Sequence, residues 1–211
     1  MSEEVDGAAA GQRNLADRTR RRRRAAVAGH RNDPTTARAL LHDDDGVVRA
    51  TALGALARCG AVTAGDLGAA LADPDPTVRI RAAAVAAAGP TGVSLLGLLD
   101  DPDPTVVEAA AWACGERDPA EPGAVARLAG LTTAHDDPLV REAAVAALGA
   151  IGDPAGLAAV LAACGDRATV RRRAVLALAP FDGPEVDDAL QRALADRDGD
   201  VRRAAADLLG R

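Results

Sequence analysis

Aromatic side chains are nearly missing from this sequence, which has one Trp, one Phe and no Tyr among 211 residues. Hydrophobic residues still make up 48% of the chain, so its core must be built from Ala, Val and Leu. Ala and Leu are strong helix formers, whereas β-sheets normally need runs of β-branched and aromatic residues. The composition therefore favours an all-helical protein whose small side chains let the helices pack closely.

Paired cysteines and long apolar runs are also missing. Cys59, Cys114 and Cys164 lie far apart without a CxxC pair, which argues against a zinc site and a disulfide framework and predicts buried free thiols. No apolar stretch approaches the ~20 residues of a membrane span, and AAVAG followed by HRND is no signal-peptide core. We expect a cytoplasmic protein with no membrane contact, metal or cofactor.

One phrase recurs along the chain: an Asp, often a Pro, then Val-Arg and an Ala-rich run that ends near Gly. Examples are DPDPTVRIRAAAVAAAG and HDDPLVREAAVAALGAIG. The Val of this phrase, the anchor valine, recurs at intervals of 30, 28, 34, 30 and 31 residues. The anchors are Val48, Val78, Val106, Val140, Val170 and Val201. A near-constant period of this size indicates a helical repeat protein.

Each repeat unit divides into two helices. An Asp three residues before the anchor can cap the second helix, usually with Pro or Gly next. The capping residues are Asp45, Asp75, Asp103, Asp137 and Asp198. In the fifth unit Arg167 stands there, so the cap would fall to Asp166 or Thr169. We predict first helices near 34–42, 63–72, 91–100, 121–133, 154–164 and 184–195, and second helices near 46–59, 76–88, 104–115, 138–150, 168–179 and 199–209.

The repeat type follows from the opening of the second helix. Tetratricopeptide units need Trp, Tyr and Phe landmarks that this chain hardly contains, and the ankyrin TPLH start is absent. The Asp-Pro-x-Val-Arg opening resembles HEAT-like repeat proteins of the short bacterial type, first noted in phycobilin lyase subunits. The resemblance covers about residues 31–211. It implies an all-α fold, an α-α superhelix (a HEAT-like solenoid) of about six helical pairs.

The repeated residues are expected to hold the stack together. Counted from the anchor valine as position 0, positions 4 and 8 fall on the same side of a helix, as in Val140, Ala144 and Leu148. The Arg at position 1 lies at the edge of this core stripe, where it can reach the capping Asp of an adjacent unit. The resemblance implies that such residues form an Asp and Arg ladder along the loops. We assign to it Arg49, Arg79, Arg141, Arg171 and Arg202.

The third unit breaks the pattern. Its ladder Arg is replaced by Val107, and Glu108, Trp112 and Glu116 follow at i, i+4 and i+8 on one helix face. This face lies about opposite the core stripe. In a HEAT-like stack the second helices line the concave surface, so Trp112 would lie in the groove between two carboxylates. Glu142 occupies position 2 of the fourth unit.

Two interpretations of Trp112 stay open. In one, the indole fills a gap between Ala-rich helices and its N–H bonds to a Glu. In the other, it is an exposed hot spot for a basic or peptide ligand. Position 2 or 3 of the last two units is basic, so the groove would change from acidic in the middle to basic at its C-terminal end. The predicted partner-binding residues are Glu108, Trp112, Glu116, Glu142, Arg172, Arg173 and Arg203.

The N-terminal region is basic. Residues 1–14 lack apolar periodicity and are predicted to be disordered, and residues 31–211 form the repeat domain. Aligned on Gly29, residues 15–30 resemble a second helix without its partner, a capping half-repeat. Its arginines are Arg18, Arg20, Arg21, Arg22, Arg23 and Arg24. They can neutralise phosphates, which makes nucleic-acid binding an alternative function. Otherwise they form a solvated cap balanced by HDDD at 42–45, and the net charge of -6 works against a general nucleic-acid surface.

Known enzymes with this architecture can be tested for by their metal-binding or catalytic residues. Deoxyhypusine hydroxylase holds iron with His-Glu pairs, and no Glu follows His30, His42 or His135. HEAT-like alkylpurine DNA glycosylases use a basic concave face with aromatics, which one Trp beside several Glu matches poorly. Phycobilin lyase subunits share the repeat type but have no obvious shared catalytic motif with which to compare this chain. No phosphate loop or nucleophile elbow occurs. We therefore predict a non-catalytic protein- or peptide-binding scaffold; a HEAT-repeat enzyme or lyase subunit is a further alternative, behind nucleic-acid binding.

Overall fold

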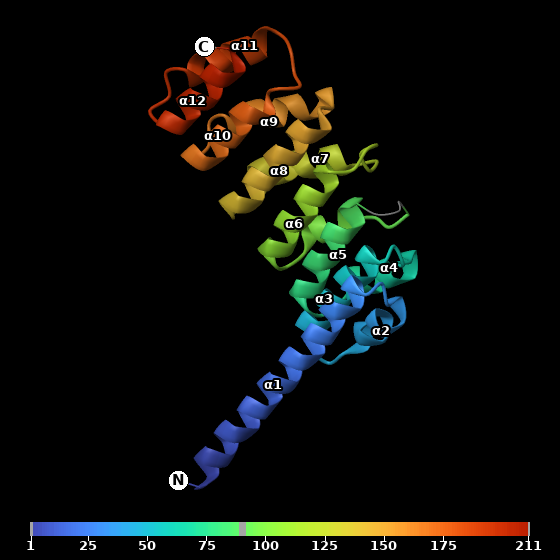
Figure 1. Ribbon diagram of the computed structural model, residues 1–211. Coiled ribbons are helices and arrows are strands. Elements are labelled where there is room, and N and C mark those ends of the chain that lie inside the picture. The colour runs from blue at the N-terminus through green and yellow to red at the C-terminus, as the bar shows by residue number, and fades with distance from the viewer. Residues whose placement is uncertain (1, 89–91, 211) are drawn as a thin grey trace. The chain divides into compact units, whose positions relative to one another are not determined.

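The protein is all-α. The computed structural model describes the backbone of residues 2–88 and 92–210 and the side chains of residues 15–88 and 92–210. These residues form α-helices, short 3-10 helices and turns, with no β-strand among them. The chain divides into two compact units, Met1–Val93 and Ser94–Arg211. Each unit is a stack of paired helices (Figure 1), which confirms the predicted fold class.

In unit 1 the second helices of the repeats stack on one another. They are α3 (Gly46–Arg58) and α5 (Pro76–Ala88), and α1 (Ser2–His30) packs on α3 from its other side. The first helices are α2 (Pro34–Ala39), continued by the 3-10 helix η1 (Leu40–His42), and α4 (Ala64–Leu71). Each first helix packs on the second helix that follows it in the chain.

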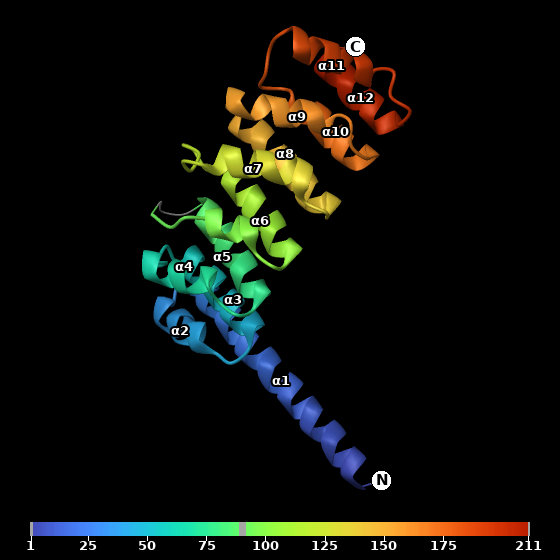
Figure 2. The same ribbon diagram turned by 180° about the vertical axis from the view of Figure 1, so that it is seen from behind.

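Unit 2 repeats this arrangement. Its second helices, α6 (Pro104–Gly115), α8 (Pro138–Ile151), α10 (Ala168–Ala177) and α12 (Gly199–Leu208), pack in that order. The helices before them are η2 (Leu96–Asp100), α7 (Ala124–Ala134), η3 (Pro154–Gly156) with α9 (Leu157–Ala163), and α11 (Pro184–Ala193). In both views the second helices of unit 2 lie along one side and α7, α9 and α11 along the other (Figures 1 and 2).

The predicted second helices are confirmed to within two residues at each end. The first helix predicted at 91–100 is wrong in its first half. Residues 89–91 lie outside the described residues, Gly92 has a φ of 140°, and a 3-10 helix begins at Leu96. The backbone N–H of Leu95 donates to Glu121 at 3.0 Å instead of entering a helix, which explains the late start.

Small residues set the spacing between stacked helices. A Cβ on Gly115 would lie 2.8 Å from Cα of Ala147, and a Cβ on Gly149 would lie 2.7 Å from Cα of Ala177. Only glycine permits such close approach of two backbones. Because these helices meet at their backbones, Ala, Val and Leu fill almost all of the core, together with Cys114 and Phe181. The core stripe of α8 is buried, with Val140, Ala144 and Leu148 at most 1% exposed.

The same close approach fixes the register of α1. A Cβ on Gly29 would lie 2.9 Å from Cα of Ala55, so Gly29 meets α3 as Gly115 meets α8. In this register Arg20 is position 0 and Arg21 is position 1 of a repeat. The contact is the one that the predicted capping half-repeat requires. The helix itself spans Ser2–His30 with no end at residue 15, and the predicted disorder of residues 1–14 stays a prediction.

Forked ion pairs join consecutive repeats within each unit. Nε and Nη2 of Arg171 donate to the two carboxylate oxygens of Asp196 at 2.9 and 2.8 Å, and Nη1 donates to the carbonyl of Asp166 at 2.7 Å. Each guanidinium therefore ties the loop of its own repeat to the loop of the next. The described forks, called the Asp–Arg ladder below, are Arg49–Asp73, Arg141–Asp166 and Arg171–Asp196.

The ladder uses a different Asp from the predicted one. The caps are confirmed, for example at Asp198, which accepts from the N–H groups of Asp200 and Val201. The ladder acceptor is Asp196, two residues earlier, which also accepts the N–H of Asp198 at 2.8 Å. One Asp thus shapes the loop and binds the Arg of the preceding repeat, while the next Asp starts the helix.

The fifth unit keeps the ladder Asp but lacks a capping Asp. Neither Asp166 nor Thr169 caps α10, which begins after Arg167 without a side-chain cap. Asp166 instead accepts the N–H of Arg167 at 2.6 Å and the fork of Arg141. The loop is one residue shorter than the others, so it has no room for separate ladder and cap residues.

The ladder predicts acid sensitivity. Hydrogen bonds from Arg171 and Arg141 hold the pKa values of Asp196 and Asp166 below the ordinary 3.8. A depressed folded pKa gives stability that is complete above the unfolded pKa and is lost as pH falls through the folded one. We expect urea unfolding to give a free energy that varies little from pH 7 to 5 and drops below about pH 4. The drop should be smaller in Asp196→Asn, and an equal drop in both proteins would contradict this assignment.

Candidate functional site

The ladder is interrupted between the third and fourth repeats at both partner positions. Val107 replaces the Arg and is 1% exposed. In the loop of the fourth repeat, His135 replaces the ladder Asp, and its Nδ1 accepts the N–H of Asp137 at 3.0 Å. His135 thus keeps the loop-shaping bond without offering a carboxylate. Val107 was recognisable as a departure in the sequence, whereas His135 was missed. Four other repeats have an Asp five residues before the anchor valine: Asp43, Asp73, Asp101 and Asp196.

Trp112 lies exposed on the helix that carries this interruption. It is 49% exposed on α6, and the indole N–H donates to no residue within the described ranges. Glu108 and Glu116, one turn before and after it, are exposed and have no ion-pair partner among the described residues. The result is an aromatic side chain between two free carboxylates, called the Trp112 patch below.

The remaining predicted groove residues are partly neutralised. Nη2 of Arg173 on α10 lies 3.4 Å from Oε1 of Glu142 on α8. Arg203 pairs with Asp200 one turn earlier at 3.3 Å. Arg172 is exposed and has no described partner. The structure therefore brings Glu142 and Arg173 together and leaves Arg172 as the free cation of this group.

The N-terminal arginines divide into paired and free groups. Arg21 lies 3.5 Å from Asp43, which makes this contact equivalent in register to a ladder fork, and Arg18 lies 3.6 Å from Asp45. Arg20 and Arg21 also approach Asp17 at 3.9 and 3.4 Å. The acidic loop at 42–45 therefore neutralises the charges of Arg18 and Arg21, as one interpretation of the basic region predicts. The exposed arginines without a described partner are Arg22, Arg23 and Arg24.

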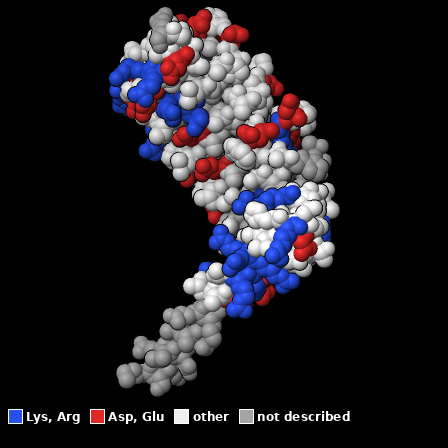
Figure 3. Space-filling view, in the orientation of Figure 1, with Lys and Arg blue, Asp and Glu red and all other residues white. Residues whose placement is uncertain are grey.

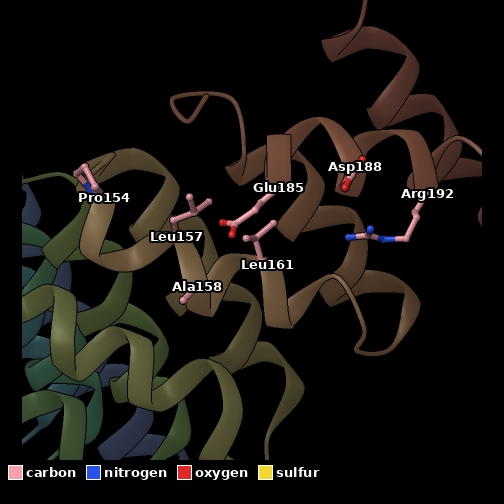
Figure 4. Close-up of a pocket in the computed structure, with 7 residues that line it drawn as sticks. All are labelled: Pro154, Leu157, Ala158, Leu161, Glu185, Asp188 and Arg192. Carbon is pink, nitrogen blue, oxygen red and sulfur yellow. The ribbon is translucent and has the colours of Figure 1, made fainter. Parts of the chain in front are cut away.

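A surface groove of about 590 Å³ lies between α9 and α11 (Figure 4). Glu185 of α11 points toward Leu157 and Leu161 of α9, and Arg192 lies farther along α11 (Figure 4). The lining residues are Pro154, Leu157, Ala158, Leu161, Glu185, Asp188 and Arg192. This lining contains no Ser, Thr, Cys or His, so it offers no hydroxyl or thiol nucleophile.

Two of the three cysteines are held in the protonated form by burial. Burial raises the pKa of the Cys114 and Cys164 thiols to about 11, so both are protonated at neutral pH. Among the residues that the structure describes, no group of three or more His, Cys, Asp or Glu could hold a metal ion.

The described helices also include none whose length and hydropathy suit a membrane span.

Comparisons with known proteins agree with this architecture. Residues 93–179 match the family model described as HEAT repeats, and residues 170–196 match that of the PBS lyase HEAT-like repeat. No curated protein sequence matches the chain. The two models together match residues 93–196, so this part of the chain carries HEAT-type repeats.

Solved structures share the fold. An engineered protein is 24% identical with a TM-score of 0.61, covering 84% of this chain and 97% of its own. YibA of E. coli is 20% identical with a TM-score of 0.59, covering 82% and 68%. A designed armadillo repeat protein in complex with the peptide (KR)4 is 17% identical with a TM-score of 0.52, covering 95% and 93%.

The interrupted ladder can be tested by rebuilding it. Val107→Arg alone should lower the free energy of unfolding by several kcal/mol, because it places an unpaired charge in a buried site. Adding His135→Asp should supply the missing acceptor and recover part of the loss. In a double-mutant cycle followed by urea unfolding, we expect a favourable coupling of about 1–3 kcal/mol. Simple additivity of the two changes would show that the two positions do not form a ladder site.

Proposed function

We propose that the protein is a non-catalytic scaffold that binds a protein or peptide on the face formed by α6 and α8, with Trp112 as the central contact. The observation that carries the proposal is the exposure of this Trp, 49%, in a chain with one Trp, one Phe and no Tyr. Trp is among the residues that contribute most to protein interfaces. Burial of the exposed indole against a partner would therefore stabilise a complex.

Charge suggests the chemistry of the partner. Glu108 and Glu116 flank the indole without described partners, and residues 94–211 carry 20 acidic residues against 12 arginines, a net charge of -8. A basic side chain can lie over an indole ring while it pairs with a carboxylate. We therefore propose a basic peptide segment as the ligand. The designed armadillo repeat protein solved with (KR)4 supplies a first probe of this kind.

A non-catalytic role in the cytoplasm is part of the same proposal. The repeated acids act as helix caps and ladder acceptors, as at Asp198 and Asp196, so their abundance needs no catalytic explanation. The three cysteines are free thiols, as is usual in a reducing compartment. Neither observation depends on the Trp112 patch.

The chain carries its own reporter for this proposal. Trp112 is the only Trp and Tyr is absent, so tryptophan emission arises from the Trp112 patch alone. Titration with (KR)4 should change this emission, and an acidic (ED)4 peptide should leave it unchanged. By calorimetry, Trp112→Ala should weaken (KR)4 binding at least tenfold, as expected for a hot spot.

Leu208→Ala provides a matched control, since Leu208 is also partly exposed, at 36%, but lies on α12. It should bind (KR)4 like the original protein. The proposal predicts that Trp112→Ala keeps its thermal stability and loses partners in a pull-down from the native cell. If the variant unfolds at much lower temperature and binds (KR)4 and captured partners normally, Trp112 serves packing instead.

A further inference from the structure

Unit 1 presents arginines on the helix face that carries the Trp112 patch in unit 2. With Gly29 fixing the register of α1, Arg22 and Arg23 fall at positions 2 and 3 of a repeat. On the next helices, Arg58 occupies position 10 of α3, as Glu116 does on α6, and Arg81 occupies position 3 of α5. These four residues, called the arginine face below, come from three stacked helices.

The side chains of this face lie across their neighbouring helices. Nε and Nη2 of Arg58 are 2.8 Å from where a Cβ of Gly29 would be, so Arg58 reaches α1. The guanidinium end of Arg81 passes 3.7–3.9 Å from the equivalent point on Gly54, so it lies over α3. Figure 3 shows the blue arginine atoms gathered over this part of unit 1. The two glycines leave the room in which the guanidinium groups lie.

Among the described residues, no acidic side chain pairs with these arginines. Arg173, which has the position of Arg81 in its own repeat, reaches Glu142 on the preceding helix at 3.4 Å. The residue equivalent to Glu142 before Arg81 is Ala50, which is 4% exposed. All four side chains of the arginine face are exposed and have no ion pair within the described residues. Neither α3 nor α5 contains an acidic residue.

The net charge of unit 1 is also positive, although the whole chain is negative. Residues 1–93 carry 13 arginines against 11 acidic residues, a net charge of +2, in a chain of net charge -6. The acids of the described part lie mainly in the loops as caps and ladder acceptors, such as Asp45 and Asp73. The four arginines of this face are therefore not neutralised by described acids, and a polyanion can approach them from solvent.

We propose that the arginine face binds the phosphate backbone of a nucleic-acid duplex, independently of sequence. Guanidinium groups match phosphate oxygens in geometry and stay charged at any working pH. Protein partners usually need an apolar anchor, and none of the four residues of this face is apolar; the large exposed hydrophobic residue in the described part of unit 1 is Leu15, two turns before Arg22 on α1. Unstacked single strands usually need aromatic platforms, which the face lacks. Backbone contacts to a duplex require neither.

Salt dependence gives the first test. Binding of the full chain to a fluorescently labelled random duplex of about 20 base pairs should be measured by anisotropy between about 50 and 200 mM salt. Four neutralised phosphates predict a log–log slope of about -3.6. Parallel DNA and RNA duplexes distinguish the source of the phosphates. No binding near 50 mM salt, or a slope near zero, would overturn the proposal.

Variants give the second test. Arg58→Gln with Arg81→Gln should make the slope less steep by about 2 and weaken binding at least tenfold at low salt. Arg22→Gln with Arg23→Gln should do the same independently. These side chains have no described partner, so both proteins should fold. Arg172→Gln with Arg203→Gln is the matched control on unit 2 and should bind the duplex normally.

Competition identifies the ligand class. Polyglutamate should displace the duplex weakly, and a single strand of equal length should compete less well than the duplex. Tighter binding of polyglutamate or of the single strand would contradict the proposal. Trp112→Ala should bind the duplex like the original protein, so failure of this proposal and failure of the peptide proposal are separate results.

Discussion

The fork from an Arg at position 1 of one repeat to an Asp in the loop of the next is the contact on which the stack depends. In the Arg171–Asp196 fork, two bonds of 2.9 and 2.8 Å cross between repeats and a third holds the loop of the Arg's own repeat. Such a fork fixes distance and orientation together, because a guanidinium and a carboxylate fit in one plane. With loops held in this way, a core of small side chains is sufficient to keep the helices in register.

This arrangement separates charges that hold the fold from charges that are free to bind. On α10, Arg171 is buried in the ladder while its neighbour Arg172 faces solvent without a described partner. The same separation gives the exposed helix face its character. Where position 2 or 10 carries Glu, as around Trp112, the face suits a basic segment; where it carries unpaired Arg, as on α1 and α3, it suits phosphate. One repeat scaffold can therefore present two surfaces of opposite charge.

Much of the fold was predictable because the same sequence signals recur in each repeat. The period, the capping Asp and the core stripe located the second helices, and Asp198 caps as expected. The late start of the helix at Leu96 was not predicted, because the bond from the N–H of Leu95 to Glu121 depends on tertiary structure. At the candidate sites, Trp112 stood out as a departure from the repeat. Arg58 and Arg81 did not, because their lack of partners depends on which residues of the adjacent helix they face.

On this basis the ladder arginines stabilise the stack and the free arginines do not. Urea unfolding of Arg171→Gln beside Arg172→Gln tests it most directly, because the two residues are adjacent on one helix and the substitution is the same. We expect Arg171→Gln to lower the free energy of unfolding by about 3 kcal/mol, as for a broken buried pair, and Arg172→Gln to change it by less than about 0.5 kcal/mol. Equal effects of the two substitutions would contradict it.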